Sequence, residues 1–520
     1  MNLVRATATI GGLTLVSRVL GFARDMLMAR FVGAGFASDA FLIAFRLPNL
    51  FRALFAEGAF SQAFVPMFSR RLGPDGELGP ARRFAEDALS VLLPVLVVFT
   101  AIMIIAAGPV VLAMTGGFRD GTPEKYWLTV QFTRITFPYL MLISLVSLLG
   151  GILNSLNRFW VNAAAPILLN ISMIVALLFF RGATDIETAR AQSVAVTVSG
   201  LLQLLWLMWA CRQADVRLRL RLPRLSPDVR QLLKVIWPAA LGAGAVQFNL
   251  LISTSLAARF LEQGSVSYLY YADRLNQLPL GLVGIGVGTA LLPTLSRHLG
   301  QGRLAEATHT QNRAIELVLL LTLPACAALM VSAVPLIRAL LQHGHFTAGD
   351  TIASAQALAA FSLGLPAYVL IKVLTPAFYA RSDTKTPVRI ALLSMLVNLI
   401  GNLVLIWPLA HVGLALSTAI SAWVNAVLLY IVLHRRGHFT ADARLKRATV
   451  RLLGATLVMA ALLFVLNPFL DPMMAHGLWR RIIGLLVLIG VGALAYFGAA
   501  IGLRAFTLGD LKQQLVRRRG

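Results

Sequence analysis

Residues 17–25 read SRVLGFARD, and residues 38–66 read SDAFLIAFRLPNLFRALFAEGAFSQAFVP. Both stretches are mostly apolar and fit membrane-spanning helices, yet ionisable side chains interrupt them. An ionisable side chain at mid-bilayer depth costs about 2.5–3.5 kcal/mol on insertion scales, so a group of them predicts an interior polar pathway. The charged residues between positions 18 and 57 are Arg18, Arg24, Asp25, Arg30, Asp39, Arg46, Arg52 and Glu57.

The composition of the whole chain predicts an all-α polytopic membrane protein. Hydrophobic residues make up 58% of the chain and charged residues only 13%, and apolar runs recur along its length. We expect about fourteen transmembrane helices. The predicted spans are 6–30, 38–68, 86–114, 129–156, 160–180, 191–211, 234–260, 267–296, 314–341, 352–380, 387–408, 412–434, 448–468 and 479–503.

The formal net charge of +24 is explained by the loops between these spans. Lys and Arg residues gather in alternate loops, whereas the intervening loops 261–266 and 408–411 contain none. Cytoplasmic loops carry such an excess, so both termini are predicted to be cytoplasmic and nucleic-acid binding is not needed to explain the charge. The basic loops and tail include Arg70, Arg71, Arg82, Arg83, Arg217, Arg219, Arg221, Arg297, Arg381, Lys385, Arg435, Arg444, Arg517 and Arg518.

The chain also contains an internal repeat. Positions Arg30, Arg46 and Arg70 have counterparts about 228 residues later in the chain. Six predicted spans lie in each period, so the two copies should have the same orientation and be related by an axis along the membrane normal. The counterparts are Arg259, Arg274 and Arg297.

The repeat suggests how the chain is divided. The predicted parts are an N-lobe with spans 1–6 (1–212), a basic cytoplasmic linker (213–233), a C-lobe with spans 7–12 (234–434), a basic cytoplasmic loop (435–447), two additional spans (448–503) and a basic cytoplasmic tail (504–520). Two six-helix halves favour an alternating-access transporter whose site lies at the seam between them.

Helical geometry places polar residues of the first span, among them Ser17, Arg18, Gly21, Arg24 and Asp25, on one third of the helix surface. Such charges can also form ion pairs that only fix the packing of helices, and this alternative stays open for each acid. The arginines outnumber the nearby acids, so an anionic substrate is favoured.

These residues resemble a known family. The stretches at 17–25 and 38–66, together with YYADRLNQLPLGLVGIGVGTALLP at 270–293 and FYARSDTKTPV at 378–388, closely resemble the MurJ/MviN lipid II flippases of bacterial cell-wall synthesis. The resemblance covers essentially the whole chain. That family belongs to the superfamily of multidrug, oligosaccharidyl-lipid and polysaccharide exporters.

The resemblance implies a transporter, and not an enzyme, that moves undecaprenyl-diphosphate-linked peptidoglycan monomer from the cytoplasmic to the periplasmic leaflet by alternating access. It implies a cationic cavity lined by spans 1, 2, 7 and 8, and a groove for the lipid tail formed by spans 13 and 14. The implied diphosphate-binding residues are Arg18, Arg24, Arg52 and Arg274, and the implied gating or ion-pairing acids are Asp25, Asp39, Glu57 and Asp273.

The resemblance further implies a multi-pass protein of the bacterial inner membrane whose partners are lipid II and membrane lipids. We expect a monomer, with contact to the cell-wall synthesis machinery left open. No cofactor and no metal ion is expected, because neither the histidines nor the acids are spaced as a metal site. No Walker motif is present, so coupling to the membrane potential or to an ion gradient stays open.

The sequence favours three alternative functions less. A multidrug exporter of the same superfamily, taking organic cations, would need uncovered carboxylates, which the excess of arginine opposes. A membrane enzyme acting on polyprenyl phosphates would need a cluster of acids for a metal ion or a nucleophile beside a base. A structural scaffold would have no use for costly charge inside the membrane.

Overall fold

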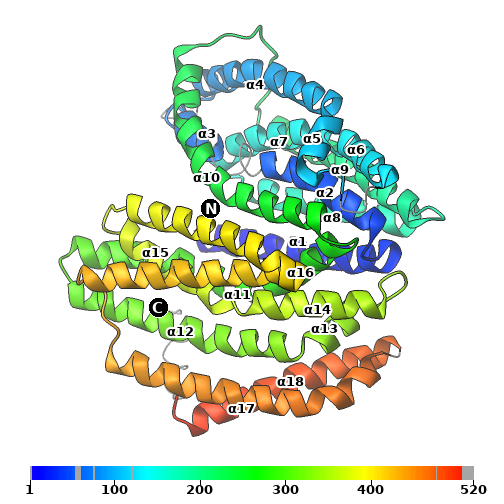
Figure 1. Cartoon of the computed structure of the whole chain (residues 1–520). Helices are drawn as coiled ribbons and strands as arrows, with labels where there is room; N and C mark the ends of the chain where they lie inside the picture. Colours follow the sequence, from blue (N-terminus) through cyan, green and yellow to red (C-terminus); the bar gives the residue numbers. More distant parts are fainter. Residues whose placement is uncertain (1–2, 53–59, 74–76, 119–121, 476, 506–520) are drawn as a thin grey trace. The chain divides into compact units, whose positions relative to one another are not determined.

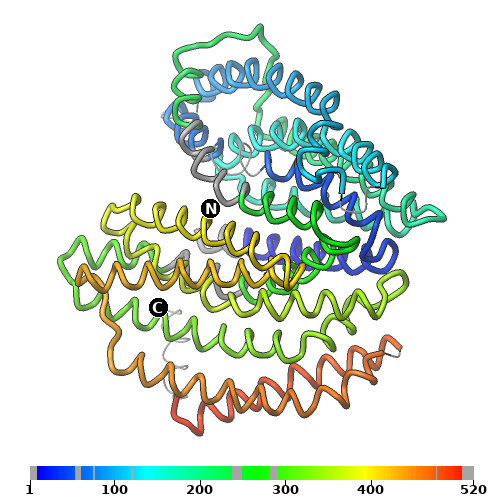
Figure 2. Tube along the Cα trace, viewed as in Figure 1, coloured from blue at the N-terminus to red at the C-terminus, as the bar shows by residue number. Residues whose placement is uncertain are grey.

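The structure is a computed structural model that describes residues 3–52, 60–73, 77–118, 122–475 and 477–505 (Figure 2). Side chains are not described for residues 3–8, 62, 237–246, 248 and 282–290. Throughout the described residues the regular elements are helices, and they form two compact units (Figure 1). The all-α fold class that the sequence predicts is confirmed.

The N-terminal unit comprises residues Met1–Ser267 together with the short segment His343–Phe346. In it α1 packs against α8, α2 against α6, and both α7 and α8 against α9. Its helices are α1 (Leu3–Val32), α2 (Phe36–Phe51), α3 (Phe60–Ser69), α4 (Gly79–Ile105), α5 (Ala107–Thr115), α6 (Pro123–Thr136), α7 (Pro138–Ser155), α8 (Phe159–Phe179), α9 (Asp185–Arg212) and α10 (Pro227–Phe260).

The C-terminal unit comprises Tyr268–Gln342 and Thr347–Gly520, and α11 (Ser265–Gly300) begins in the N-terminal unit and continues into it. In it α17 packs against α12 and α18, and α15 packs against α12 and α16. Its further helices are α12 (Leu304–Val331), α13 (Ala333–Leu341), α14 (Ala348–Ser362), α15 (Leu365–Tyr379), α16 (Lys385–Arg435), α17 (Ala443–Met474) and α18 (Leu478–Gly502).

Each predicted span overlaps a helix or two successive helices. The spans 387–408 and 412–434 both lie in α16, which Ala410 interrupts with a non-helical backbone (φ 49°, ψ −130°) just after Pro408. Nine helical stretches among the described residues are long and apolar enough to cross a membrane, so the number fourteen stays a prediction. These stretches are Gly79–Ile105, Pro123–Ser155, Phe159–Phe179, Asp185–Arg212, Leu304–Val331, Ala348–Tyr379, Lys385–Arg435, Ala443–Met474 and Leu478–Gly502.

The same helix interruptions occur in both units, in line with the predicted repeat. Helices α6 and α7 are separated just before Pro138, and α14 and α15 just before Pro366. A proline lacks the backbone N–H that a continuing helix would use, so it starts a new helix readily. In the same way α4 passes into α5 at Ala106, and α12 passes into α13 at Ser332.

Large apolar side chains cover the outside of α4, α17 and α18. Leu457 and Phe464 of α17 and Leu494 of α18 are each about 70% exposed or more, and a water-soluble protein rarely exposes so large an apolar surface. By contrast, two thirds of the most apolar part of Pro123–Ser155 is buried inside the protein. This pattern is that of a multi-pass membrane protein with lipid-facing and interior helices.

The basic segment between α9 and α10 is fastened to the N-terminal unit by Glu86 of α4. The Glu86 side chain is fully buried, accepts a hydrogen bond from the Arg219 backbone N–H at 3.1 Å, and forms ion pairs with Arg221 at 2.7 Å and Arg82 at 3.3 Å. Farther along, Asp228 at the start of α10 pairs with Arg71.

The compact units divide within α11, whereas the predicted lobes divide in the linker 213–233, so the predicted lobes stay a prediction.

Candidate functional site

Arg24 of α1 is the most deeply buried of the predicted substrate-binding arginines. Its side chain is 7% exposed, and its Nη2 and Nε atoms lie 2.7 and 3.0 Å from one carboxylate oxygen of Asp25. Its Nη1 atom donates to Asn170 Oδ1 at 3.1 Å and approaches the sulfur of Met173 on α8. A buried guanidinium is tolerated when hydrogen bonds and a counter-charge meet it in this way.

Asn170 also explains part of the polar stripe on α1. Its amide donates to the Ser17 carbonyl at 2.9 Å, and Gly21 faces it, since a Cβ at Gly21 would be in van der Waals contact with Asn170 Oδ1 at 3.5 Å. Ser17, Gly21 and Arg24 therefore face α8 inside the N-terminal unit. Arg18, on the same helix, is exposed.

Asp39 of α2 is held by groups from two other helices. Its side chain forms an ion pair with Lys125 of α6 at 3.2 Å, and both side chains are 3% exposed. The same carboxylate accepts hydrogen bonds from the N–H groups of Gly264 and Ser267 at 2.7 and 3.0 Å and from the Ser267 hydroxyl at 2.7 Å. Because α11 begins at Ser265, Asp39 caps its N-terminus, where a negative charge is favoured.

Sequence reasoning predicted an ionic role for Asp39 but missed Lys125. The predicted span began at residue 129, which left Lys125 in a loop, whereas α6 begins at Pro123 and carries Lys125 into the interior. The Lys125 ammonium also lies 4.8 Å from the centre of the Phe118 ring. A single lysine directly ahead of a long apolar run was the feature that could have revealed it.

The turn between α1 and α2 packs against the segment His343–Phe346 of the same unit. The His345 N–H donates to the Arg30 carbonyl at 3.0 Å, and Gly33 has a positive φ of 78° with the His345 carbonyl oxygen only 2.7 Å from where its Cβ would be. Gly344 also has a positive φ, and a Cβ there would collide with the Arg30 carbonyl. A larger residue at either glycine would separate this turn from the segment.

The remaining predicted residues of the N-terminal unit lie at the end of α2. Arg52 is half-buried, and its Nε atom donates to Asn49 Oδ1 at 3.2 Å. Arg46 donates to the carbonyl of Leu250 on α10. Glu57 lies outside the described residues.

Arg274 and Asp273 belong to the C-terminal unit. The half-buried Arg274 guanidinium lies 5.0 Å from the centre of the Tyr270 ring, one turn earlier on α11, in a cation–π contact. Asp273 accepts a hydrogen bond from Gln277. The grouping of Arg274 with the arginines of the N-terminal unit stays a prediction.

The Arg24 site has the chemistry to bind an anion. Among the described residues no group of three His, Cys, Asp or Glu side chains is arranged to hold a metal. The Arg24 guanidinium, by contrast, already binds a carboxylate oxygen with two N–H groups, and a phosphate oxygen can take the same position.

The chain matches one family along most of its length. A family model described as lipid II flippase MurJ matches residues 28–482. A probable lipid II flippase MurJ from Rhizobium tropici is 43% identical over 526 residues, which cover 100% of this chain and 98% of the relative. Lipid II flippase MurJ of Burkholderia cenocepacia is 39% identical over 469 residues, which cover 89% of this chain and 90% of the relative.

Solved structures share the fold. A structure of lipid II flippase MurJ in an inward closed conformation has a TM-score of 0.77 at 23% identity, covering 95% of this chain and 98% of that one. An inward-facing multidrug resistance transporter of the MATE family has a TM-score of 0.69 at 16% identity, covering 82% of this chain and 97% of that one. The family model and the two relatives cover most or all of the sequence, and on that ground this protein belongs to the lipid II flippase MurJ family.

Proposed function

We propose that this protein is a transporter of the bacterial inner membrane that moves lipid II, the lipid-linked peptidoglycan precursor, from the cytoplasmic to the periplasmic leaflet by alternating access. Membership of the lipid II flippase MurJ family over the whole chain is the observation that carries this proposal. The buried Arg24 fits it, because a diphosphate leaving water needs fixed cations to replace its hydration.

In this proposal Arg24 binds the diphosphate, and the Asp25 carboxylate occupies the diphosphate position on Arg24 when no substrate is bound. The Asp25 carboxylate now accepts both the Nε–H and an Nη2–H of Arg24. A phosphate oxygen entering there would displace the carboxylate, and the displaced Asp25 would then need another counter-charge or a proton, because a buried carboxylate left alone is costly. Arg18, Arg52 and Arg274 are proposed as further ligands of the diphosphate.

Asp39 and Lys125 are proposed to form a gate element. The carboxylate of Asp39 ties α2 and α6 to the start of α11, so its release would free the N-terminus of α11 to move. Glu57 and Asp273 are proposed as further ion-pairing acids. The exposed apolar faces of α17 and α18 are proposed to form the groove for the lipid tail.

Several wider features of the proposal rest on the sequence. Both termini are proposed to be cytoplasmic, because the basic loops alternate with loops poor in cations. The protein is proposed to act as a monomer driven by the membrane potential or an ion gradient, and to work beside the cell-wall synthesis machinery. Export of organic cations is not favoured, since the multidrug transporters share the fold alone.

The proposal is tested by growth of cells depleted of their own lipid II flippase. Arg24→Ala should abolish growth support although the protein is inserted normally, and Arg24→Lys should retain part of it, because a lysine keeps the charge but loses the two-pronged geometry. Arg30→Lys, at an exposed position of the same helix, is the matched control and should support full growth. Full growth with Arg24→Ala would refute the diphosphate-binding role.

A further inference from the structure

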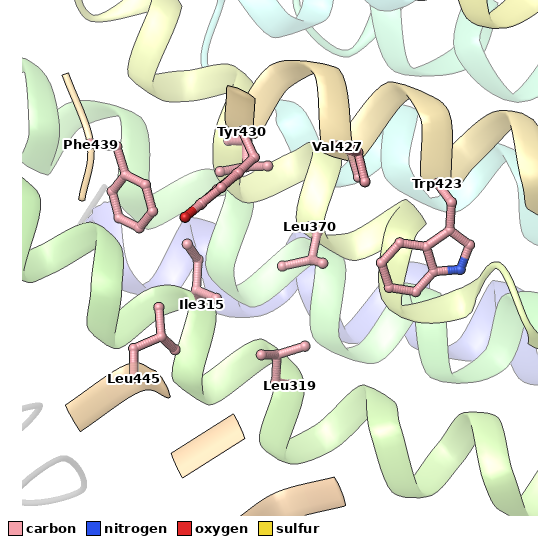
Figure 3. A pocket seen from close by; sticks show the side chains of 10 residues that line it. Ile315, Leu319, Leu370, Trp423, Val427, Tyr430, Phe439 and Leu445 are labelled. Atoms are coloured by element: carbon pink, nitrogen blue, oxygen red, sulfur yellow. The ribbon is translucent and has the colours of Figure 1, made fainter. Parts of the chain in front are cut away.

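An elongated apolar pocket runs beside the second half of α16 in the C-terminal unit. Its volume is about 230 Å³, and side chains of α12, α15, α16 and α17 line it. Figure 3 shows Trp423 at one end and Phe439 at the other, with Tyr430, Ile315 and Leu370 between them. We call this pocket the α16 slot.

The shape of the slot suits a hydrocarbon chain. Trp423 and Tyr430 are seven residues apart on one face of the helix, which corresponds to roughly 10 Å along its axis. Apart from the Tyr430 hydroxyl and the Trp423 indole N–H, which donates to the Leu363 carbonyl at 2.8 Å, the labelled side chains in Figure 3 consist of carbon atoms. A straight apolar chain along α16 would therefore meet carbon atoms over most of its length.

A second apolar hollow adjoins the slot. It has a volume of about 350 Å³ around Ile420, Val424 and Leu428, and Trp423 and Val427 line both hollows. Val427 is 46% exposed and Trp423 is 39% exposed, so these two side chains form an exposed ridge between the two hollows. Two neighbouring hollows with a shared ridge match a ligand that has two hydrocarbon chains.

One end of the slot lies beside a cluster of cations. Leu445, which lines the slot, is flanked in sequence by Arg444 and Lys446, and α16 ends at Arg435, which Arg436 follows. Arg444 pairs with Glu316 and Arg436 pairs with Asp383, whereas the exposed side chains of Arg435 and Lys446 are engaged in no ion pair among the described residues. An anionic headgroup would be attracted to this end.

We propose that the α16 slot and the hollow beside it bind an anionic glycerophospholipid, with one acyl chain on each side of the Trp423–Val427 ridge and the phosphate against Arg435 and Lys446. This lipid is a bound component of the C-terminal unit and is not the transported substrate. The proposal therefore stands whether or not lipid II is moved.

The test is native mass spectrometry of the purified full chain, titrated separately with phosphatidylglycerol, phosphatidylethanolamine and undecaprenyl phosphate. Val427→Phe extends the ridge into the hollows on both sides. We expect this change to weaken phosphatidylglycerol binding about tenfold, because several methylene groups of the acyl chains lose their burial. Val95→Phe on α4 is the matched control, since Val95 is 58% exposed, lies outside both hollows and belongs to neither α17 nor α18; it should bind like the wild type.

A second pair of variants tests the headgroup. Arg435→Gln combined with Lys446→Gln should remove the preference for phosphatidylglycerol over phosphatidylethanolamine, whereas Arg480→Gln at the start of α18 should keep it. If Val427→Phe fails to fold, Val427→Leu serves the same purpose with less added bulk. Unchanged binding by the Val427 variant, equal binding of both phospholipids to the wild type, or stronger binding of undecaprenyl phosphate would each overturn the proposal.

Discussion

At the residue scale, Asp39 has a carboxylate on which four donors converge. Lys125, the N–H groups of Gly264 and Ser267 and the Ser267 hydroxyl all bind it, and its own side chain is 3% exposed. A buried ion pair of this kind is costly to break, because the remaining partner is left as an uncompensated charge. The packing of helices and the proposed gate therefore depend on the same pair.

Lys125→Met should destabilise the protein by about 3 kcal/mol, because it leaves the Asp39 carboxylate without its counter-charge. Combining it with Asp39→Asn should cost clearly less than the sum of the two single changes, since neither buried charge then remains. Thermal unfolding in detergent measures both effects. Lys385→Met, at an exposed lysine, is the control and should unfold like the wild type; additive losses would argue against the coupling.

The sequence could predict which ionisable residues lie inside the protein, but not which groups they contact there. Arg24 and Asp25 are neighbours in sequence, so their pairing was within reach. The hydrogen bonds that Arg24 donates to Asn170 and Lys125 donates to Asp39 join residues far apart in sequence, and helical periodicity carries no information on such contacts.

At the element scale, helix ends and connections are fixed by particular polar contacts. Thr347 and Asp350 form a reciprocal capping box at the start of α14, and Asp442 caps α17 by accepting from the Leu445 N–H at 2.6 Å. Capping residues and prolines mark these helix starts in the sequence, whereas the predicted spans rest on apolar runs and begin several residues later. The attachment of the linker to Glu86 did not, because it depends on the packing of α4.

Replacing Glu86 should release the linker. We expect Glu86→Ala to raise the rate of trypsin cleavage between residues 216 and 226 about tenfold, because a buried carboxylate that pairs with Arg82 and Arg221 is lost. Limited proteolysis followed by mass spectrometry measures the rate. Asp87→Ala, next in sequence, is the control, and an equal rate for both variants would contradict the role of Glu86.

The connection between α15 and α16 should show a pH dependence. Side-chain and backbone hydrogen bonds from Thr386, and then the Arg436 side chain, lower the pKa of Asp383 well below its usual range. A lowered pKa stabilises the fold above the ordinary carboxyl pKa of about 4, and this contribution is lost as the pH falls through the lowered value.

Asp383→Asn should therefore lower the melting temperature at neutral pH, and the difference from the wild type should shrink as the pH falls below about 4. Melting curves over a range of pH values measure this. Asp215→Asn, at an exposed position, should show no such pH-dependent difference. A constant difference for Asp383→Asn at every pH would contradict the assignment.

At the scale of the whole molecule, hydropathy predicted the all-α membrane fold because lipid-facing helices need apolar surfaces whatever their neighbours. The repeated interruptions at Pro138 and Pro366 follow from the repeat in the sequence. The predicted grouping of Arg274 with Arg18, Arg24 and Arg52 concerns residues of both units, and long-range association of that kind is not encoded in local patterns.

The central claim is that the protein moves lipid II between leaflets and that Arg24 is needed for this. The most direct measurement uses the purified protein in vesicles with labelled lipid II, and follows the fraction that a membrane-impermeant reagent can reach. With an imposed potential or ion gradient, the wild type should accelerate the exchange of lipid II between leaflets but not that of labelled phosphatidylethanolamine. The Arg24→Ala variant should not accelerate the exchange of lipid II. Failure of the folded wild-type protein to accelerate lipid II under any imposed potential or ion gradient would contradict the account.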